Sequence, residues 1–379
     1  MFLPIVLCDL DAAFLGFELL RHPQLAAAPV IVGGAAAQRG VVATASYEAR
    51  AFGIRSGMAT AEALRRCPHA TFLPVDMRYY QEMSHRFRDV VTRGVAVWEP
   101  VALDEVYLDL NGQRESFPDT AAFACALQRS VQDELGLHCS VGASGGRALA
   151  KLACELLAKP GGVALLPPQE AHGVLGSRPV GVLPGIGPAT EATLTRYGIS
   201  TCGRLAALSD DLVVALLGQR GPVLRDLARG VDPSRPQVPG GPRSISVEET
   251  FATDLRGPDA PRSALVSLAW ELGLRLGAEG LAPREVGLVW RTADFRDHSR
   301  QRTLAQPVRT RMELRLAALG LWQQADVRQP VRLLGIRAGH LVHRPRPLLP
   351  EDRLEAVLGD LEAQGRGLRP AALLRRDPR

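Results

Sequence analysis

The sequence predicts a multidomain protein of mixed α/β and α+β architecture, and three features support this. Its 379 residues exceed the length of one ordinary domain. From about residue 166, strands and longer helices give way to short helices separated by glycine turns. The Pro/Gly-rich segment QVPGGPR at 237–243 then precedes a region in which helical and strand-like runs alternate. We therefore expect three structured regions, with a linker before the last.

The first region is predicted to combine short strands with helices. Its expected strands are short apolar runs bounded by turn residues: 3–8, 29–33, 40–44, 101–110 and 138–144. Its expected helices share apolar spacing near 3.6 residues: 61–67, 79–97, 120–135 and 146–158. Pro160 and Gly161 end the last of these helices.

The later regions differ from each other in texture. The second is an all-helical module of short helices and glycine turns. The third is expected to be α+β, with helices at 261–279 and 308–320. Its strand-like runs are 284–292, 300–308 and 330–341.

Composition is that of a soluble, intracellular protein. Hydrophobic residues make up 46% of the chain, yet no run approaches the roughly 18–20 apolar residues of a membrane span. The apolar N-terminus lacks a basic segment and is interrupted by Asp9 and Asp11, so we expect no signal peptide. The six cysteines are widely spaced, which argues against a zinc site or a disulfide framework and fits a reducing cytoplasm.

Basic residues are distributed unevenly. Residues 241–379 hold 23 arginines against 17 acidic residues, which indicates either a polyanion partner or a solvated basic surface. Only two of the 45 basic residues are lysines, Lys151 and Lys159, and both lie in ALAKLACELLAKPGG. A chain so rich in arginine that keeps lysine only there suggests a need for a compact ammonium group.

Three carboxylates interrupt apolar strand-like runs. Asp9 follows PIVLC, and Asp104 and Glu105 lie inside VALDEVYLDL. Adjacent residues of a regular strand point to opposite faces, so both acids reach one site only if the chain bends there. Carboxylate oxygens bind hard cations such as Mg²⁺, and paired Mg²⁺ ions serve phosphoryl transfer. From these residues alone, a metal site and a solvated surface turn both remain open.

Taken together, the motifs resemble those of the Y-family DNA polymerases, in particular the DNA polymerase IV branch. Collinear segments along nearly the whole chain carry the resemblance: CDLDAAF (8–14), VVATASYEARAFGIRSGM (41–58), EALRRCPHA (62–70), ALDEVYLDL (102–110), VGASGGRALAKLACELLAKPGG (141–162), LPGIGPATEATLTRYGI (183–199), RSISVEETF (243–251) and PVRLLGIRAGHL (330–341).

The resemblance implies a right-hand polymerase with an added C-terminal domain. The palm would combine 1–10 with 76–165, and the fingers would be 11–75. A helical thumb with a helix–hairpin–helix would span 166–233, a linker 234–242 and the little finger 243–345. Residues 346–379 would form a C-terminal tail.

It also implies the site residues. Asp9, Asp104 and Glu105 match the catalytic, metal-binding carboxylates, and the Leu10 carbonyl matches a further ligand, with two Mg²⁺ ions expected. The matches for nucleotide binding are Phe14, Thr44, Tyr47, Arg50 and Lys159, of which Phe14 is the steric gate against the ribose 2′-hydroxyl. Those for DNA binding are Gly185, Gly187, Arg243, Ser244 and Ser246.

The expected function is template-directed, low-fidelity DNA synthesis by two-metal nucleotidyl transfer, without proofreading and in translesion synthesis. Primer–template DNA and dNTPs are the expected partners of a monomer. Two departures stand out. Ala13 replaces the aromatic residue that usually precedes the gate. The segment 344–353 lies where relatives carry a sliding-clamp peptide, but it has neither the glutamine nor the aromatic residue of that motif.

Two other functions explain part of the sequence. A catalytically inactive Y-family accessory protein would bind DNA without extending a primer. A base-excision glycosylase would use the helix–hairpin–helix with the downstream Asp210, but it leaves the first 180 residues unexplained.

Overall fold

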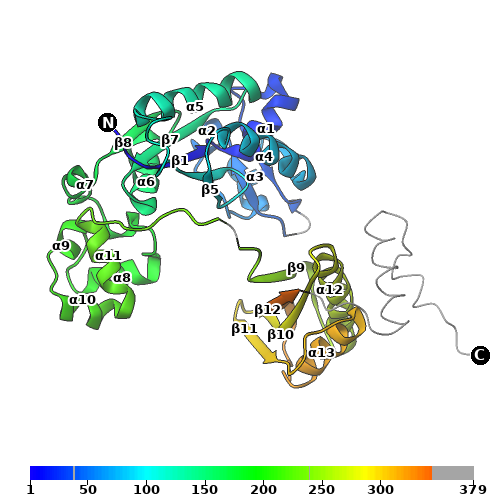
Figure 1. Cartoon of the computed structure of the whole chain (residues 1–379). Helices are drawn as coiled ribbons and strands as arrows, with labels where there is room; N and C mark the ends of the chain where they lie inside the picture. Colours follow the sequence, from blue (N-terminus) through cyan, green and yellow to red (C-terminus); the bar gives the residue numbers. More distant parts are fainter. Residues whose placement is uncertain (37–38, 239, 344–379) are drawn as a thin grey trace, which may run out of the picture. The chain divides into compact units, whose positions relative to one another are not determined.

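The computed structural model describes residues 1–36, 39–238 and 240–343, which belong to two compact units (Figure 1). The chain divides at residues 239–240, inside the segment where the sequence predicts a linker. Residues 232–237 are tied to the first unit: Asp232 accepts a hydrogen bond from the Leu149 backbone, and the Gln237 backbone donates to Glu99. The predicted clamp segment and tail lie outside the described residues. In the described part of the chain, no helix has the length and apolar character needed to cross a membrane.

A five-stranded sheet is the centre of the first unit, with strand order β5-β6-β1-β7-β8. The strands are β1 (Ile5–Leu10), β5 (Val97–Pro100), β6 (Glu105–Asp109), β7 (Cys139–Ser144) and β8 (Val163–Leu166). All neighbouring pairs are antiparallel except β7 and β8. The central strand β1 is buried along its whole length, so its last residues are held firmly at one end of the sheet.

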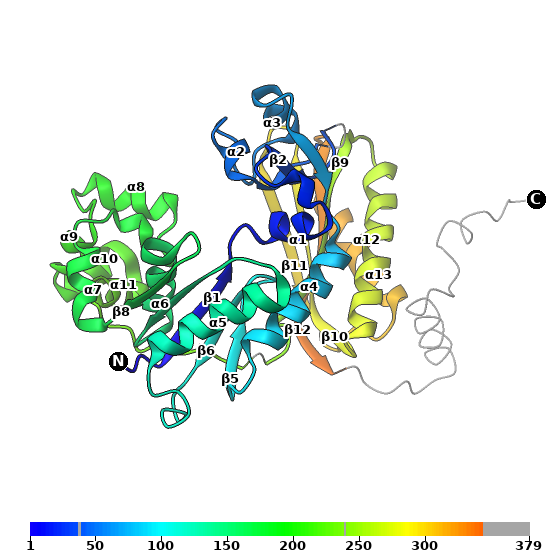
Figure 2. The same ribbon diagram turned by 90° about the horizontal axis from the view of Figure 1, so that it is seen from above.

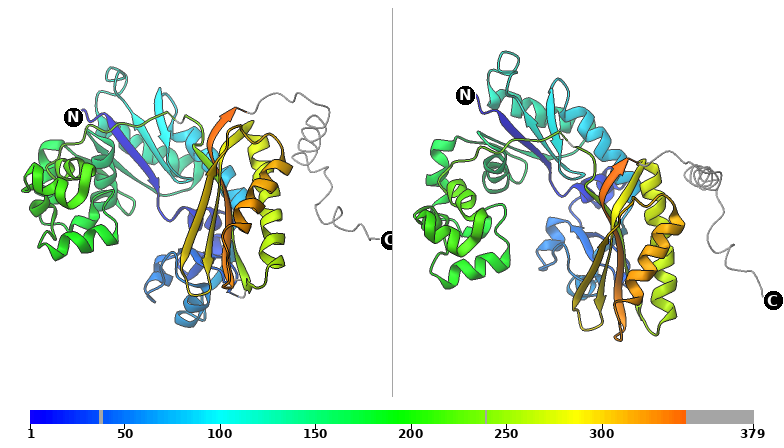
Figure 3. Two further views of the ribbon diagram at one scale, coloured as in Figure 1. Left: turned by 90° about the horizontal axis from the view of Figure 1, so that it is seen from below. Right: turned by 60° about the horizontal axis from the view of Figure 1, so that its bottom comes forward.

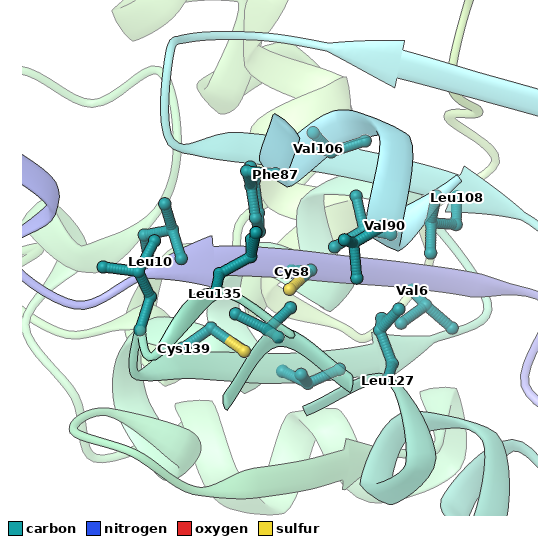
Figure 4. Packing of buried hydrophobic residues seen from close by; sticks show 14 of the residues in the cluster. Val6, Cys8, Leu10, Phe87, Val90, Val106, Leu108, Leu127, Leu135 and Cys139 are labelled. Carbon is teal, nitrogen blue, oxygen red and sulfur yellow. The ribbon is translucent and has the colours of Figure 1, made fainter. Parts of the chain in front are cut away.

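Helices cover both faces of this sheet. On one face, α4 (Met77–Val91) and α5 (Thr120–Leu135) pack against alternate residues of β1. Figure 4 shows Phe87 of α4 near Cys8 and Leu127 of α5 beside Val6 in this layer, and Figure 2 shows α5 running across the strands. On the other face lie α6 (Arg147–Ala153) and a π-helical turn, Cys154–Ala158, which contact Leu7 of β1.

The helix expected at 79–97 is shorter than predicted. It ends at Val91, and β5 begins at Val97. Gly94 has φ +78°, a left-handed conformation that ends a helix at little steric cost. The segment expected as one helix at 146–158 changes from α to π geometry at Cys154.

A smaller sheet with short helices follows β1. Its strand order is β3-β2-β4, formed by β2 (Val30–Gly33), β3 (Val42–Ala45) and β4 (Thr71–Pro74). The helices nearby are α1 (Ala13–Arg21), α2 (Tyr47–Arg50) and α3 (Thr60–Arg66), with a 3₁₀ turn at Pro23–Leu25. Their core is small and centres on Ile31, Val42 and Ile54.

The rest of the first unit is the predicted helical module. Its helices are α7 (Pro168–Leu175), α8 (Pro188–Arg196), α9 (Cys202–Ala206), α10 (Asp210–Leu217) and α11 (Gly221–Ala228), with 3₁₀ turns at Val180–Val182 and Gly218–Arg220. One hydrophobic cluster joins this module to α6 through Leu149 and Leu152.

The second unit is an α+β domain, as the sequence predicts. Its antiparallel sheet has the order β11-β10-β12-β9, formed by β9 (Ser244–Leu255), β10 (Leu281–Thr292), β11 (Asp297–Thr303) and β12 (Val331–His343). Both views in Figure 3 show α12 (Asp259–Ala278) and α13 (Arg311–Gln323), drawn in yellow and orange, along one face of it. The other face is left uncovered by these helices.

Candidate active site

The fold brings the three predicted carboxylates to one end of the central strands. Asp9 lies directly opposite Glu105 in the antiparallel pairing of β1 and β6. The Leu10 backbone N–H donates to the Asp104 carbonyl at 2.9 Å. The predicted bend is confirmed: β5 ends at Pro100 and β6 begins at Glu105, so the turn occupies 101–104. The turn frees Asp104 from the strand and lets its side chain lie near the other two acids.

Strand alternation decides which way Asp9 and Glu105 point. Ile5 and Leu7 of β1 pack with Tyr107 of β6 against α6. Residues two apart on a strand share a face, so Asp9 and Glu105 continue this row toward the helix side. Both are nearly buried, with 6% and 9% of their surface exposed. The acids of the site therefore lie at the end of the apolar layer between the sheet and α6.

The two lysines of the chain meet these acids. Lys159 Nζ lies 2.9 Å from Asp9 Oδ1 and 3.0 Å from Glu155 Oε1, and Lys151 Nζ lies 2.8 Å from Glu105 Oε2. Lys151 had no predicted contact, so its pairing with Glu105 is a finding of the structure. An ammonium group can reach into this narrow layer as a point charge, which the planar guanidinium of arginine cannot do as readily.

Burial disfavours the charged form of these carboxylates and so shifts their pKa values. Loss of solvent raises the pKa of Asp9 to about 6, although Lys159 acts against the rise. Burial likewise raises the pKa of Asp104, and the negative charge of Glu105 adds to the effect. The Oε1 atom of Glu105 is buried without a hydrogen-bond partner. These acids therefore have more negative charge and more acceptor capacity than their protein neighbours satisfy.

This donor set fits a hard divalent cation. It offers carboxylate oxygens, which are ligands that Mg²⁺ takes, and one of these buried oxygens lacks a partner. Among the described residues, no group of three or more His, Cys, Asp or Glu side chains lies in an arrangement that could hold a metal ion as it stands. Lys159 and Lys151 offset part of the charge of Asp9 and Glu105.

A glycine in β7 sets how closely α6 approaches the sheet. A Cβ on Gly142 would collide with the Cys154 nitrogen and the Ala150 carbonyl oxygen, both backbone atoms. Gly142 thus allows the helix and the turn behind it to lie against the strand. Because Lys151 and Lys159 belong to this segment, the close approach is what brings them within reach of the acids.

Asp11, the second acid of the DLD motif, has a structural role that the sequence did not reveal. Its Oδ1 accepts from Ser140 Oγ at 2.8 Å, and its Oδ2 accepts from the Gly161 backbone N–H at 2.9 Å. Gly161 N–H also reaches Ser140 Oγ at 2.9 Å. This network ties the end of β1 to the loop that carries Lys159, which fixes the position of that lysine.

Phe14, the predicted steric gate, is partly buried at the start of α1. Its ring stacks on Tyr80 of α4, with ring centroids 4.5 Å apart and an interplanar angle of 25°. Ala13 beside it is 5% exposed.

The predicted triphosphate-binding residues lie on β3 and α2. Thr44 is buried within β3, whereas Tyr47 is 55% exposed. Arg50 donates from Nε to the Ala45 carbonyl at 3.0 Å, and its guanidinium lies 5.0 Å from the Tyr47 ring centroid. Ser46 caps α2 by accepting from the Ala49 backbone at 3.2 Å. The cap and these contacts hold Tyr47 and Arg50 together on the surface.

A cavity of about 560 Å³ lies beside the β1–α1 turn. Tyr47 lines it together with Asp11, Ala12 and Gly161. Of the predicted nucleotide-binding residues, Tyr47 alone belongs to the described lining; Thr44, Arg50, Phe14 and Lys159 do not.

The predicted DNA-binding glycines lie in the helical module. Gly185 has φ +101°, and a Cβ there would come within 3.0 Å of Arg220 Nη2. Gly187 is the N-cap of α8, which has no side-chain cap, so its first backbone N–H groups point out of the helix end. Gly185, Arg220 and Thr190 line one cavity of about 350 Å³.

The remaining predicted DNA-binding residues are at the start of β9. Arg243 is exposed, and Ser246 lies opposite Arg337 of β12. Val247 packs in the core with the helices, so by alternation Ser244 and Ser246 face the uncovered side of the sheet. Arg337, which sequence reasoning did not select, shares that side and is exposed.

The described part of the chain has the fold of a Y-family DNA polymerase. A solved Y-family DNA polymerase chimera of Dbh and Dpo4 is similar in structure, with a TM-score of 0.82. The likeness covers 89% of this chain and 99% of that one, at 22% sequence identity. This agrees with the predicted fold class.

Sequence comparisons define the family more closely. Residues 8–155 match the impB/mucB/samB family, and residues 242–348 match its C-terminal domain. A DNA polymerase IV of Methanoculleus marisnigri is 40% identical over 88% of this chain and 93% of that protein. One of Dehalococcoides mccartyi is 37% identical over 94% of this chain and 91% of that protein. The chain therefore belongs to the impB/mucB/samB family, the Y-family polymerases, within the DNA polymerase IV branch.

Family membership removes the glycosylase alternative. The match begins at residue 8, in the part of the chain that the glycosylase interpretation left unexplained. Asp210, its candidate acid, forms an ion pair with Arg225 and lies in the first turn of α10. Asp210 is thus accounted for as a structural residue.

Proposed function

We propose that this protein is a template-directed DNA polymerase that extends a primer at Asp9, Asp104 and Glu105, without proofreading, in translesion synthesis. The single observation that carries the proposal is the meeting of these acids at the end of β1 and β6, with buried and incompletely satisfied oxygens. The relatives named DNA polymerase IV supply the substrate class, namely primer–template DNA and dNTPs.

In the proposed reaction, the primer 3′-hydroxyl oxygen bonds to the α-phosphorus of the dNTP. The bond from that phosphorus to the bridging oxygen breaks, pyrophosphate leaves with the electron pair, and the hydroxyl proton passes to solvent water. Two bound Mg²⁺ ions would neutralise phosphate charge and lower the pKa of the attacking hydroxyl. Asp9, Asp104, Glu105 and the Leu10 carbonyl would hold them.

The chain's cations would hold the triphosphate. Lys159 is poised at the edge of the acid cluster, where it already bonds to two carboxylates. Arg50 presents a planar fork that can bind phosphate oxygens bidentately. The exposed Tyr47 hydroxyl beside it can donate a further hydrogen bond, and Thr44 can assist from β3. This arrangement would orient the α-phosphate toward the acids.

Lesion tolerance is proposed from small side chains in β3 and in the segment that follows it. Ala43, Gly57 and Ala59 would cover the nascent base pair, and nothing lies within 4 Å of a Cβ built on Gly57. Fewer van der Waals contacts there would weaken the geometric test that rejects a distorted pair.

DNA would be held along its backbone. The free N–H groups at the start of α8 and the arginines of the second unit suit phosphate contacts, which position a duplex without reading its sequence. In domain terms, we propose that 1–10 with 76–165 is the palm, 11–75 the fingers, 166–233 the thumb and 243–345 the little finger. A monomeric state and binding of a sliding clamp stay predictions.

The proposal is tested by single-nucleotide primer extension with the wild-type protein. We expect Mg²⁺-dependent addition of the dNTP that the template base selects, and we expect a mismatched primer end to persist rather than be excised. Binding of primer–template DNA without any extension would favour the accessory-protein alternative. Excision of the mismatched end would show the no-proofreading part to be wrong.

A further inference from the structure

The Phe14 ring packs against the ring of a buried tyrosine. Tyr80 of α4 is 0% exposed, and its ring stacks on Phe14 and also packs against Phe17 at 5.8 Å between centroids. Ala13, next to Phe14, offers only a methyl group. The stacked ring of Tyr80 is therefore the aromatic contact that determines where Phe14 lies.

The hydroxyl of Tyr80 is anchored by a buried acid. It donates to Glu18 Oε1 at 2.7 Å, and Glu18 is 4% exposed. Burial, together with this hydrogen bond, raises the pKa of Tyr80, so its hydroxyl stays protonated and remains the donor. Arg21 Nη1 lies 4.0 Å from the Glu18 carboxylate and offsets part of its charge, and His22 Nε2 lies 3.8 Å from the same carboxylate.

Glu18 and Phe14 are both on α1, four residues apart, and so lie on the same side of that helix. One contacts the face of the Tyr80 ring and the other its hydroxyl. The three residues therefore form a closed arrangement in which α1 holds one ring of α4 at two points. An apolar residue at position 18 would fill the same space. A hydrogen-bond acceptor there also fixes the orientation of the Tyr80 ring.

We propose that Glu18 and Tyr80 are positioning residues that fix the Phe14 ring and thereby set discrimination between deoxyribose and ribose. The inference rests on the proposed polymerase function, because it concerns the sugar of the incoming nucleotide. Neither residue touches the acid cluster, so the effect runs through Phe14. Since Ala13 gives little lateral support, this anchor carries the sugar selectivity that a neighbouring aromatic residue would otherwise share.

The test is the ratio of kcat/KM for a dNTP to that for the matching rNTP. Tyr80→Phe keeps the ring but loses the hydrogen bond, and we expect the rNTP kcat/KM to rise on the order of three- to tenfold. Glu18→Leu removes the acceptor and should give the same rise. Glu18→Gln keeps an acceptor oxygen and should restore the wild-type ratio to within about twofold. Tyr79→Phe is the matched control, because the Tyr79 hydroxyl donates to the Phe17 carbonyl and not to Glu18.

The double variant Glu18→Leu/Tyr80→Phe separates this role from general destabilisation. If the two residues act as one unit, the double variant should have the rNTP kcat/KM of either single variant rather than their product. A gain of rNTP use cannot come from partial unfolding, which lowers kcat/KM for both nucleotides. If Tyr80→Phe and Glu18→Leu leave the dNTP-to-rNTP ratio of kcat/KM unchanged, or if kcat/KM falls in parallel for both nucleotides, this inference is wrong but the proposed function is unaffected. A wild-type protein that incorporates no dNTP overturns the proposed function and this inference with it.

Discussion

Asp9 and Glu105 lie directly opposite each other on β1 and β6, and each bonds to a different lysine of a chain that has only two. The pairing explains how two acids can be buried side by side. Like charges buried this close together repel each other unless cations offset them. The lysines supply part of that compensation, while the free oxygen of Glu105 shows that it is incomplete.

Replacing the gate residue should change sugar choice. Phe14→Ala removes the ring that would face the ribose 2′-hydroxyl, and we expect the rNTP kcat/KM to rise on the order of 10- to 200-fold, the range for filling or emptying a small apolar pocket. Single-nucleotide incorporation with dNTP and rNTP measures it. Equal use of both sugars by the wild type would show that Phe14 is no gate here.

Arg50 should bind the nucleotide through the bidentate hydrogen bonds of its guanidinium group and not through its charge alone. Loss of charge-assisted hydrogen bonds worth about 1.5–3 kcal/mol predicts that Arg50→Ala raises the dNTP KM roughly 10- to 100-fold. Arg50→Lys should lie between, because lysine keeps the charge without the bidentate geometry. Arg78→Ala serves as the control, since Arg78 is 91% exposed and pairs with Glu82. A KM for Arg50→Ala equal to that of the control would remove Arg50 from the site.

Gly142 should be intolerant of a side chain. In Gly142→Ala the new Cβ meets backbone atoms of the segment that carries the lysines, and overpacking of this kind lowers the free energy of unfolding by about 1–3 kcal/mol. Gly173→Ala in α7 is the matched control: nothing lies within 4 Å of its added Cβ, and we expect neutrality or a gain of about 0.5–1 kcal/mol. Urea unfolding of both variants gives the comparison. Equal stability of the two would mean that α6 can move away freely.

The arginines of the second unit should bind DNA through phosphates. Removing one phosphate contact lowers the slope of log K against log salt by about one, so Arg243→Ala and Arg337→Ala should each do so, without changing sequence preference. Arg328→Ala is the control, because that side chain is 84% exposed and pairs with Asp326. Salt slopes unchanged from wild type in both test variants would place the DNA elsewhere.

Local patterns predicted most of the fold. The helix at 120–135 has the predicted bounds, because Asp119 caps its start and Gly136, at φ +68°, ends it. The helix predicted at 79–97 extends beyond the observed helix, Met77–Val91, because Val95 and Val97 continue its apolar spacing. Spacing cannot show that Gly94 turns the chain and that Val97 pairs with Asp109 of β6.

The site was predicted in part, and its omissions share one cause. The acids and Lys159 belong to segments whose motifs are readable along the chain. The partners of Lys151, Asp11 and Tyr80 are 46, 129 and 62 residues away in sequence, and these contacts arise only when the strands and helices pack together. No local pattern marks such pairs, so they had to come from the structure.

The central claim is that Asp104 and Glu105 support nucleotidyl transfer. The most direct test is Mg²⁺-dependent primer extension on an undamaged template by the wild type and by Asp104→Ala/Glu105→Ala, with primer–template binding measured for both. We predict extension by the wild type, none by the double variant, and DNA binding by both. Undiminished extension by the double variant would contradict the assignment of the site, and failure of the wild type to extend a bound primer would contradict the polymerase function itself.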